Sequence, residues 1–330
     1  MSGWISGWNY RKPITISNSG SALTDYQVLV TLDTATLISA GKMRSDGGDI
    51  RFADSNGNTL LSYWIESGIN TSSTKIWVKV PSIPASSSKT IYVYYGNPSV
   101  TSQSNIKDTF NNKGDNFDDN SLDTNIWSTS TPVGTIREVN QKLNINVPTS
   151  NNADWWDGSL KYAPVASMAL PTGNFEARAR VENYNVINSS HSGIALWLDR
   201  NNVYLWGRMN DGGSRNGFFL DKIVNNSGMS NIASISITTL PMYLGVRKTE
   251  ALYSFIYSTD NNSWSTLYTT SSLGFTPDKF GLYGKKWTTT FGLDVNFDNA
   301  YIRSYNSTEP STSVGTEKLL SGGAFLFNFI

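Results

Sequence analysis

Apolar and polar residues alternate with a period of two along most of the chain, and the 3.6-residue period of an amphipathic helix is nearly absent. In the segment KIWVKVP, Ile76, Val78 and Val80 share one face, with Trp77 and Lys79 on the other. This is the pattern of a half-buried strand. Similar segments recur throughout, separated by stretches rich in Asn, Gly and Ser that are typical of turns. The pattern predicts an all-β protein.

The order of strand-like segments predicts two domains. We expect a β-sandwich over residues 1–100, a polar linker over 101–115, and a larger two-sheet sandwich over 116–305. A tail over 306–330 follows. The one helical turn that the sequence predicts lies in DTATLISAGKM, where Gly41 could terminate it.

The tail ends in the apolar segment AFLFNFI, residues 324–330, which is too short to cross a bilayer. Because it is apolar on both faces of a strand, we expect it to be buried within this chain or against another copy, unless it is a fragment of a longer chain. The opening residues contain no apolar run of signal-peptide length. A removed signal, exit inside a virion and an intracellular protein are all compatible with that start.

Charge and cysteine content narrow the classes of partner. The chain has 26 basic and 26 acidic residues, and charged residues make up only 16% of it, against about 25% in typical soluble proteins. Because the charges balance, we do not expect a nucleic-acid partner. We do not expect a membrane span either, because the apolar runs at the two ends are shorter than the about 20 residues that a span needs. The absence of cysteine excludes disulfides, thiolate metal sites and cysteine nucleophiles.

The first hundred residues resemble a domain of unknown function found in bacterial and archaeal cell-surface proteins. The stretches that carry this likeness are GWNYRKPITIS, YQVLVTLDT, DIRFADSNGNTLLSYWIE and KIWVKVPSIPASSSKTIYVYYGNPS. The resemblance implies an extracellular, β-rich accessory module.

The second domain resembles the concanavalin-A-like, or laminin-G-like, sandwich superfamily. The matching segments are FDDNSLDTNIW, GNFEARARVENYN, SGIALWLDRNNVYLWGRM, LGVRKTEALYSFIYSTDNNSWSTL and LDVNFDNAYIR. The resemblance implies a jelly roll of the lectin and glucanase type.

No catalytic motif of this superfamily is present. Its hydrolases place two carboxylates on one strand as Glu-x-Asp-x-x-Glu, a string that this chain lacks. Glu176 and Glu182 share a strand with Arg178 and Arg180, so we interpret them as a solvated face. His191, the one histidine, lies in NSSHSG, which we interpret as an exposed turn. We therefore predict a protein that is not an enzyme.

Aromatic residues at strand positions suggest a glycan-binding site, because a ring can stack on the apolar face of a sugar. If GIALWLDR and NVYLWGRM pair, Trp197, Tyr204, Trp206 and Arg208 should share the less apolar face. Trp156 is a further candidate at the rim. The alternative is simple sheet-to-sheet packing.

Oxygen ligands near the two ends of the second domain suggest one structural calcium ion. The candidates are Asp118 and Asp119 on the opening strand, with Asp298 and Asn299 on the closing strand. The alternative is that these are ordinary turn residues.

These observations predict a non-catalytic recognition or adhesion protein of a cell surface or virion that binds a glycan or a glycosylated surface protein. One alternative is a structural subunit of a filament, fibre or virion that assembles as a homo-oligomer through its apolar tail. A less favoured alternative is a polysaccharide hydrolase or lyase.

Overall fold

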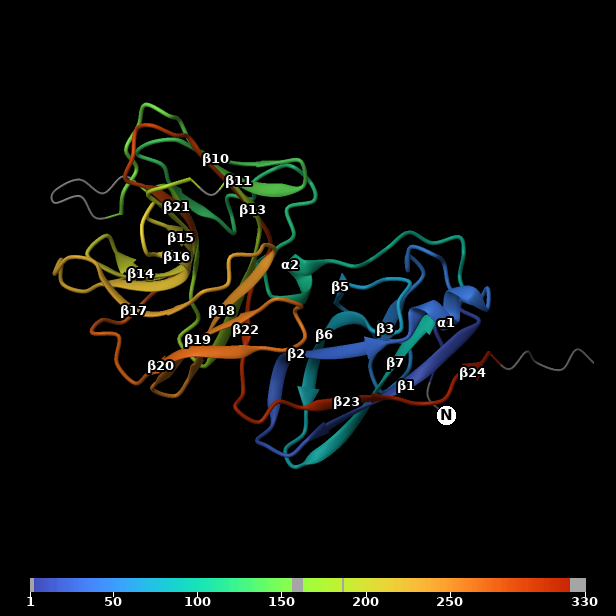
Figure 1. Cartoon of the computed structure of the whole chain (residues 1–330). Helices are drawn as coiled ribbons and strands as arrows, with labels where there is room; N and C mark the ends of the chain where they lie inside the picture. Colours follow the sequence, from blue (N-terminus) through green and yellow to red (C-terminus); the bar gives the residue numbers. More distant parts are fainter. Residues whose placement is uncertain (1–2, 156–162, 186, 321–330) are drawn as a thin grey trace, which may run out of the picture. The chain divides into compact units, whose positions relative to one another are not determined.

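The chain folds into two compact units, each of which is a β-sandwich (Figure 1). The computed structural model describes residues 3–155, 163–185 and 187–320. The first unit comprises Met1–Asn112 and Ser307–Ile330, and the second comprises Lys113–Asn306. The prediction of an all-β protein with two β-sandwiches is confirmed.

The described part of the first unit contains a six-stranded and a three-stranded antiparallel sheet. The first has the order β23-β1-β7-β3-β4, with β24 also paired to β1, and the second has the order β2-β6-β5. The strands of the larger sheet are β1 (Tyr10–Asn18), β3 (Arg51–Ala53), β4 (Leu60–Leu61), β7 (Ser87–Tyr95), β23 (Ser311–Val314) and β24 (Lys318–Leu319). Those of the smaller sheet are β2 (Leu23–Leu32), β5 (Tyr63–Ser67) and β6 (Thr74–Ile83).

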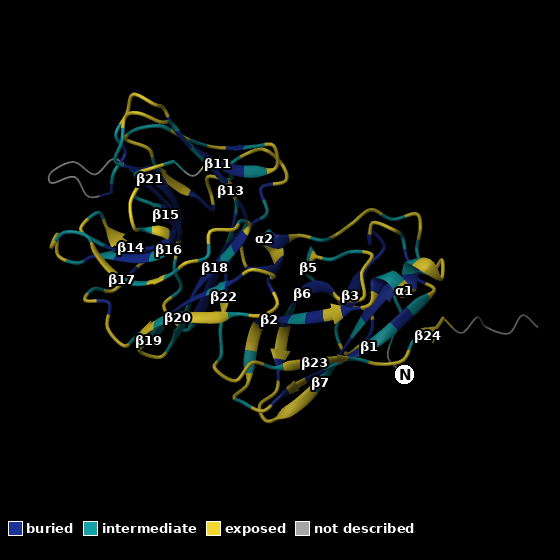
Figure 2. Cartoon of the chain, in the orientation of Figure 1, coloured by how far each residue is buried: buried dark blue, intermediate teal, exposed yellow. Residues whose placement is uncertain are grey.

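Strand alternation builds the core of the first unit. Ile14 and Ile91 from the larger sheet are fully buried, as are Ile76, Val78 and Val80 from β6. Figure 2 shows buried residues gathered in the central strands, and exposed ones in turns and in edge strands such as β23. The half-buried strand expected at KIWVKVP is therefore present, but Trp77 on its other face is also buried.

Two short helices lie in the first unit. The expected helical turn is α1 (Thr34–Ser39), whose N-cap Asp33 accepts a hydrogen bond from the Thr36 N–H at 3.0 Å. Gly41 follows the helix with φ +68°, the left-handed conformation in which glycine often ends helices. The second helix is α2 (Ile106–Thr109), capped by Asn105.

The second unit contains an eight-stranded and a seven-stranded antiparallel sheet within its described residues. The eight-stranded sheet has the order β10-β11-β22-β13-β18-β19-β20, with β8 paired to β22, and the seven-stranded sheet has the order β17-β16-β15-β14-β21-β12-β9. The eight strands are β8 (Gly114–Asp115), β10 (Thr135–Val139), β11 (Lys142–Val147), β13 (Phe175–Tyr184), β18 (Met242–Thr249), β19 (Leu252–Ser258), β20 (Ser265–Thr270) and β22 (Leu293–Ser304). The seven are β9 (Ser128–Ser130), β12 (Val165–Ala169), β14 (Ser190–Asp199), β15 (Asn202–Asn210), β16 (Asn216–Ile223), β17 (Ser230–Ile235) and β21 (Lys279–Lys286).

Two layers of apolar residues follow from this arrangement. The main core lies between the two sheets and includes Trp206 and Leu282 from the seven-stranded sheet. A second, smaller core lies on the outer face of the seven-stranded sheet and includes Trp155, Trp197 and Tyr283. The seven-stranded sheet therefore has buried apolar residues on both faces. Antiparallel sheets more commonly leave one face open to solvent.

The C-terminal segment returns to the first unit. Strand β23 pairs with residues 14–17 of β1, and β24 pairs with Tyr10 and Arg11. Between these two strands, Glu317 accepts hydrogen bonds from Lys42 at 2.5 Å and from the Tyr95 hydroxyl at 2.7 Å. Part of the expected tail thus completes the sheet of the first unit, whereas the apolar segment 324–330 lies outside the described residues.

The boundaries between units differ from the expected ones at the linker. Residues 101–112, expected as linker, carry α2 and belong to the first unit.

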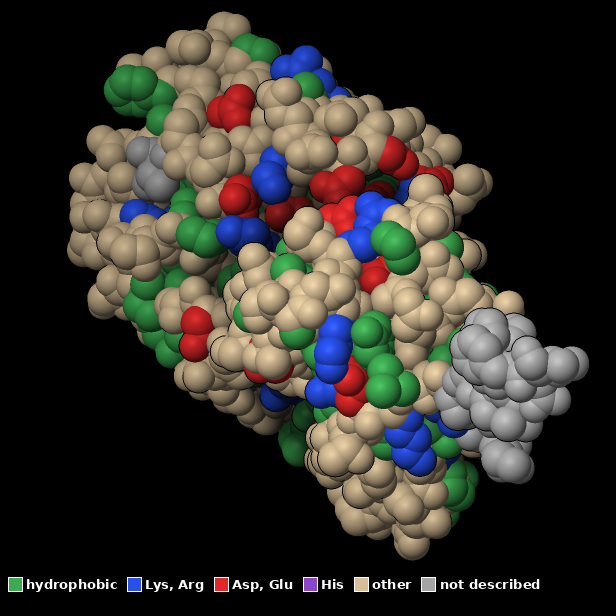
Figure 3. All heavy atoms as spheres, turned by 90° about the vertical axis from the view of Figure 1, so that its right-hand side faces the viewer, with side chains coloured by type: hydrophobic (Ala, Val, Ile, Leu, Met, Phe, Trp, Pro, Cys, Tyr) green, Lys and Arg blue, Asp and Glu red, His purple; other side chains and the backbone are tan. Residues whose placement is uncertain are grey.

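None of the helices in the described ranges is long and apolar enough to cross a membrane. On the face shown in Figure 3, basic and acidic side chains are interspersed.

Candidate functional site

The outer face of the seven-stranded sheet carries a buried polar cluster formed by His191, Asp221 and Tyr283. His191 lies in β14, Asp221 in β16 and Tyr283 in β21, and all three are completely buried. The Nε2 of His191 lies 3.2 Å from the carbonyl oxygen of Phe219, and its Nδ1 lies 3.7 Å from Oδ2 of Asp221. The interpretation of His191 as an exposed turn residue is therefore wrong.

Two glycines allow this arrangement. Gly193 and Gly207 are register partners on β14 and β15, between Tyr283 on one side and Phe219 on the other. A Cβ on Gly207 would lie 2.1 Å from the carbonyl oxygen of Ser192, and one on Gly193 would lie 2.3 Å from that of Trp206. Because no side chain rises from β15 at this point, the imidazole of β14 can approach the carboxylate of β16.

Three polar atoms of the cluster have no hydrogen-bond partner among the residues that the structure describes. They are Nδ1 of His191, Oδ2 of Asp221 and the hydroxyl oxygen of Tyr283. The other Asp221 oxygen accepts a hydrogen bond from the side-chain amide of Asn231 at 3.1 Å. A buried polar atom without a partner costs about 1–3 kcal/mol, so three of them in one cluster call for a specific explanation.

Burial also changes the acid–base properties of this cluster. It lowers the pKa of His191 to about 4, against the opposing effect of the Asp221 carboxylate. Burial, and then the nearby Asp221, raises the pKa of Tyr283 well above its usual value. Both side chains are therefore neutral at pH 7.

We expect the single histidine to titrate near pH 4, and not near its ordinary value of about 6.5. Because the folded-state pKa is lowered, the unfolded state binds more protons between these values, and stability should fall as the pH falls from about 6.5 to 4. The imidazole resonances of the intact chain measure this directly, since His191 is the one histidine. A midpoint near 6.5 would contradict the buried, neutral imidazole.

Beside the cluster lies a pocket of about 180 Å³, lined by Asp154, Arg215, Met229, Lys285 and Trp287. Nζ of Lys285 is 2.7 Å from Oδ1 of Asp154 and 4.6 Å from the centre of the Trp287 ring. We call this pocket, with the cluster, the outer-face site.

Two contacts connect the pocket to the polar cluster. Lys285 is the register partner of His191, and Nη1 of Arg215 lies 3.7 Å from Oδ1 of Asp221. Each cation of the pocket has a carboxylate beside it, because Lys285 pairs with Asp154, and Arg215 lies between Asp211 and Asp221. Such an arrangement presents fixed donors and acceptors to neutral hydroxyl groups, together with the half-buried ring of Trp287.

The five residues predicted to bind glycan do not form one surface. Tyr204 and Trp206 point into the main core, where they are 2% and 0% exposed. Trp197 lies on the opposite, outer face under Trp155, with ring centres 5.5 Å apart. Trp156 lies outside the described residues.

Arg208 is also buried, and its guanidinium donates to the carbonyl oxygens of Met209 and Gly217 and to the side chain of Asn216. The prediction that Tyr204, Trp206 and Arg208 form a ligand-binding face with Trp197 is therefore wrong. The register explains the error, because Leu196 pairs with Tyr204 while Trp197 pairs with Val203.

Two of the four predicted calcium ligands, Asp118 and Asp298, have protein side chains as partners. Oδ2 of Asp298 is 2.8 Å from Nζ of Lys142, so a cationic side chain already neutralises it, and Asp118 contacts Asn116. No group of three His, Cys, Asp or Glu residues in the described ranges is arranged to hold a metal ion. Burial, followed by the nearby Asp298 carboxylate, raises the pKa of Asp118.

Asp119 lies beside a different carboxylate. Burial, followed by Asp115 and Asp119, raises the pKa of Glu138 to about 7. One structural calcium ion held by Asp118 or Asp119 with Asp298 and Asn299 stays a prediction.

Residues that the sequence interpretation missed include Lys285, Trp287 and Tyr283. A signal for them was present, because alternation in LYGKKW places Tyr283, Lys285 and Trp287 on one face of a strand. Their proximity to His191 was not visible, since it depends on the pairing of β21 with β14.

Residues 46–130 match the model of a family described as Domain of unknown function (DUF2341). No curated protein matches the chain. The family match covers the later part of the first unit and the start of the second.

Solved structures resemble the chain at low sequence identity. A mutant of the GH43 protein BlXynB from Bacillus licheniformis aligns with a TM-score of 0.50 and 14% identity, over 74% of this chain and 46% of that one. This chain thus spans about half of that protein. A β-1,3-1,4-glucanase (lichenase) from a mouse hindgut metagenome has a TM-score of 0.42 and 11% identity, over 58% and 98% of the two chains. The carbohydrate-binding module CBM66 from Bacillus subtilis has a TM-score of 0.38 and 12% identity, over 55% and 98%.

These comparisons correct the function expected from the sequence. The structure that aligns with a TM-score of 0.50 is a GH43 protein, and the prediction of a non-catalytic recognition, adhesion or structural protein is therefore not supported. At 14% identity the likeness shows the fold alone, and one fold can serve proteins of different function.

Proposed function

We propose that the second unit binds a carbohydrate at the outer-face site. The observation that carries this proposal is the pocket itself, where the ring of Trp287 lies beside the ion-paired side chains of Lys285, Asp154 and Arg215. An indole ring stacks on the apolar face of a pyranose, and fixed polar groups bind its hydroxyls. A volume of about 180 Å³ suits one sugar ring of a longer chain.

The charge balance of the pocket favours a neutral sugar. Each cation already has a carboxylate partner, with Lys285 to Asp154 at 2.7 Å and Arg215 to Asp211 at 3.4 Å. An anionic sugar would have to compete with these carboxylates. Neutral hydroxyls can donate to the carboxylates and accept from the cations without breaking either pair.

Replacing Trp287 with alanine should weaken carbohydrate binding by tenfold or more, because an aromatic contact of about 1.4 kcal/mol corresponds to a factor of ten. We would measure affinity by calorimetry for the intact chain against neutral polysaccharides, among them xylan and a β-1,3-1,4-glucan. The same mixtures, assayed for new reducing ends, would report any turnover.

Trp264→Ala is the matched control. Trp264 is also half-buried in the second unit and also has a cation over its ring, since the guanidinium carbon of Arg178 lies 4.1 Å from its centre. If both variants bind as the unmodified chain does, the outer-face site is not the binding site. If both lose binding equally, the effect is a general loss of structure.

The resemblance of the first hundred residues to a domain of surface proteins leads us to propose an extracellular location, with a polysaccharide or a glycosylated surface molecule as the partner. This location requires that the full-length protein is secreted. It also requires that its carbohydrate ligand is accessible outside the cell.

A further inference from the structure

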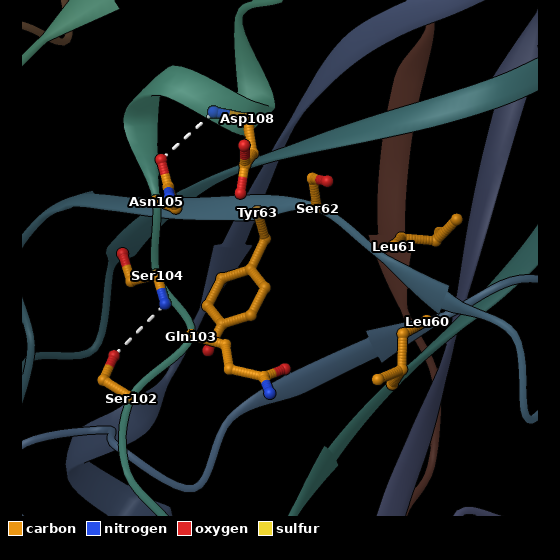
Figure 4. Close-up of a pocket in the computed structure, with 9 residues that line it drawn as sticks. All are labelled: Leu60, Leu61, Ser62, Tyr63, Ser102, Gln103, Ser104, Asn105 and Asp108. Atoms are coloured by element: carbon orange, nitrogen blue, oxygen red, sulfur yellow. Dashed lines mark hydrogen bonds between the residues drawn. The ribbon is translucent and has the colours of Figure 1, made fainter.

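The first unit contains a separate polar pocket of about 340 Å³ (Figure 4). It is formed by β4, β5 and the segment that leads into α2, and its lining residues are Leu60, Leu61, Ser62, Tyr63, Ser102, Gln103, Ser104, Asn105 and Asp108. All of them lie within residues 46–130, the range that matches the family of unknown function. We call it the first-unit pocket.

Two hydrogen bonds donated by backbone N–H groups hold the two walls of the pocket together. The Asn105 N–H donates to the carbonyl oxygen of Tyr63 at 2.8 Å, and the Ile65 N–H donates to the hydroxyl of Ser104 at 2.9 Å. Tyr63 is 1% exposed, and its hydroxyl donates to the carbonyl oxygen of Ile50 at 2.6 Å. The pocket is thus built on fixed main chain with a buried ring at its base.

The side chains that line it are suited to hydroxyl groups. Figure 4 shows the Asp108 carboxylate and the Ser62 hydroxyl near one end of the Tyr63 ring, and the Gln103 carboxamide near the other. Asn105 uses its side-chain oxygen to accept from the Asp108 N–H at 3.1 Å, which leaves its amide hydrogens as donors. The carboxylate accepts from a hydroxyl, while the carboxamides can both donate and accept.

Charge and shape exclude the main competing ligands. No lysine or arginine lines the first-unit pocket and Asp108 is acidic, so an anion would be repelled. An extended peptide would need a free strand edge, but Ser104 already bridges β5 at Tyr63. Leu60, which is 50% exposed, adds an apolar patch of the kind that covers the C–H face of a sugar.

We propose that the first-unit pocket is a second binding site for a neutral saccharide, recognised through adjacent hydroxyls by Asp108, Asn105 and Gln103. Its volume of about 340 Å³ is near the lower end of small-molecule sites and accommodates one or two sugar rings. The site does not depend on the outer-face site. If both are occupied, the chain binds bivalently, and avidity for a polymer exceeds the affinity of either site.

The experiment uses the intact chain with Trp287→Ala, which weakens the outer-face site, and a panel of neutral oligosaccharides. We expect Asp108→Asn or Gln103→Ala to weaken the remaining binding at least tenfold. Asp25→Asn is the matched control, because Asp25 is an exposed aspartate of the same unit outside the pocket. Thermal unfolding of each variant verifies that α2 is retained.

Methyl-labelled leucines give a readout that does not depend on a substitution. On addition of the saccharide, the methyl signals of Leu60 and Leu61 should shift, while Leu252, which is 49% exposed in the second unit, should not. Unchanged affinity in both pocket variants, or no binding of any neutral saccharide by the Trp287→Ala chain, would overturn the proposal. Neither result affects the outer-face site, which is tested by Trp287→Ala in the otherwise unmodified chain.

Discussion

Replacing Glu176 with glutamine is expected to lower the free energy of unfolding of the second unit by about 3–5 kcal/mol, the usual cost of removing one partner from a buried ion pair. Glu176 is completely buried on β13. Its carboxylate lies 2.9 Å from Arg178, 2.5 Å from Arg247 and 2.9 Å from Arg303. Glutamine would leave three guanidinium groups without their counter-charge.

The pH dependence of this cluster has a defined sign. Burial alone would raise the pKa of Glu176, but Arg178, Arg303 and Arg247 outweigh it and hold that pKa well below its usual range. A lowered pKa in the folded state stabilises the protein above about pH 4.3, the unfolded value, and this contribution decreases as the pH falls below it. Denaturant unfolding of the two proteins at pH 7 and at pH 3 should therefore differ less at pH 3.

Glu182→Gln is the matched control for this prediction. Glu182 lies on the same strand and pairs with Arg180 at 2.8 Å, but its side chain is 25% exposed. An ion pair that is open to solvent contributes about 0–1 kcal/mol. The expectation that Glu176 lies on a solvated face is therefore wrong, because its side chain is buried among three arginines. Equal losses for the two variants would show that this burial has no special effect on stability.

Trp206→Ala is expected to destabilise the second unit by about 3–5 kcal/mol, as large-to-small substitutions of buried aromatic residues do. Trp206 is fully buried in the main core, and its Nε1 donates to the carbonyl oxygen of Ile256 at 3.2 Å. The substitution leaves a cavity and a buried carbonyl oxygen without its donor. Denaturant unfolding, monitored by near-ultraviolet circular dichroism, measures the loss.

Phe291→Ala serves as the control, because Phe291 is an aromatic residue of the second unit that is 49% exposed. Its removal should change the free energy of unfolding by less than about 0.5 kcal/mol. Should Trp206→Ala instead lose carbohydrate binding while it keeps its stability, Trp206 would be a surface residue and the packing of β15 described above would be incorrect.

Much of the architecture follows from local pattern. Alternation in KIWVKVP predicted a strand with Ile76, Val78 and Val80 in the core, and the structure has them there. The segment YSTDNNSW, rich in the Asn, Asp and Ser residues typical of turns, joins β19 and β20 as a hairpin. These features are visible in the sequence because strand geometry and turn preferences act over only a few residues.

The candidate sites depended on longer-range structure. Alternation places Trp197 and Trp206 on opposite faces of their sheet once the register is known, but the sequence does not specify which face is the core when both are apolar. The burial of Glu176 depends on arginines from β18 and β22, which are distant in the chain.

The sequence by itself therefore determined that this chain is all-β, where many of its strands lie and that no cysteine chemistry is available, because these properties reside in composition and short-range periodicity. Only the tertiary structure decided which residues form sites. It brought His191 to Asp221 across two glycines, placed Lys285 and Trp287 beside them, and set Asp108 opposite Gln103. Each of these juxtapositions joins segments through strand pairing or packing, which local preferences do not encode.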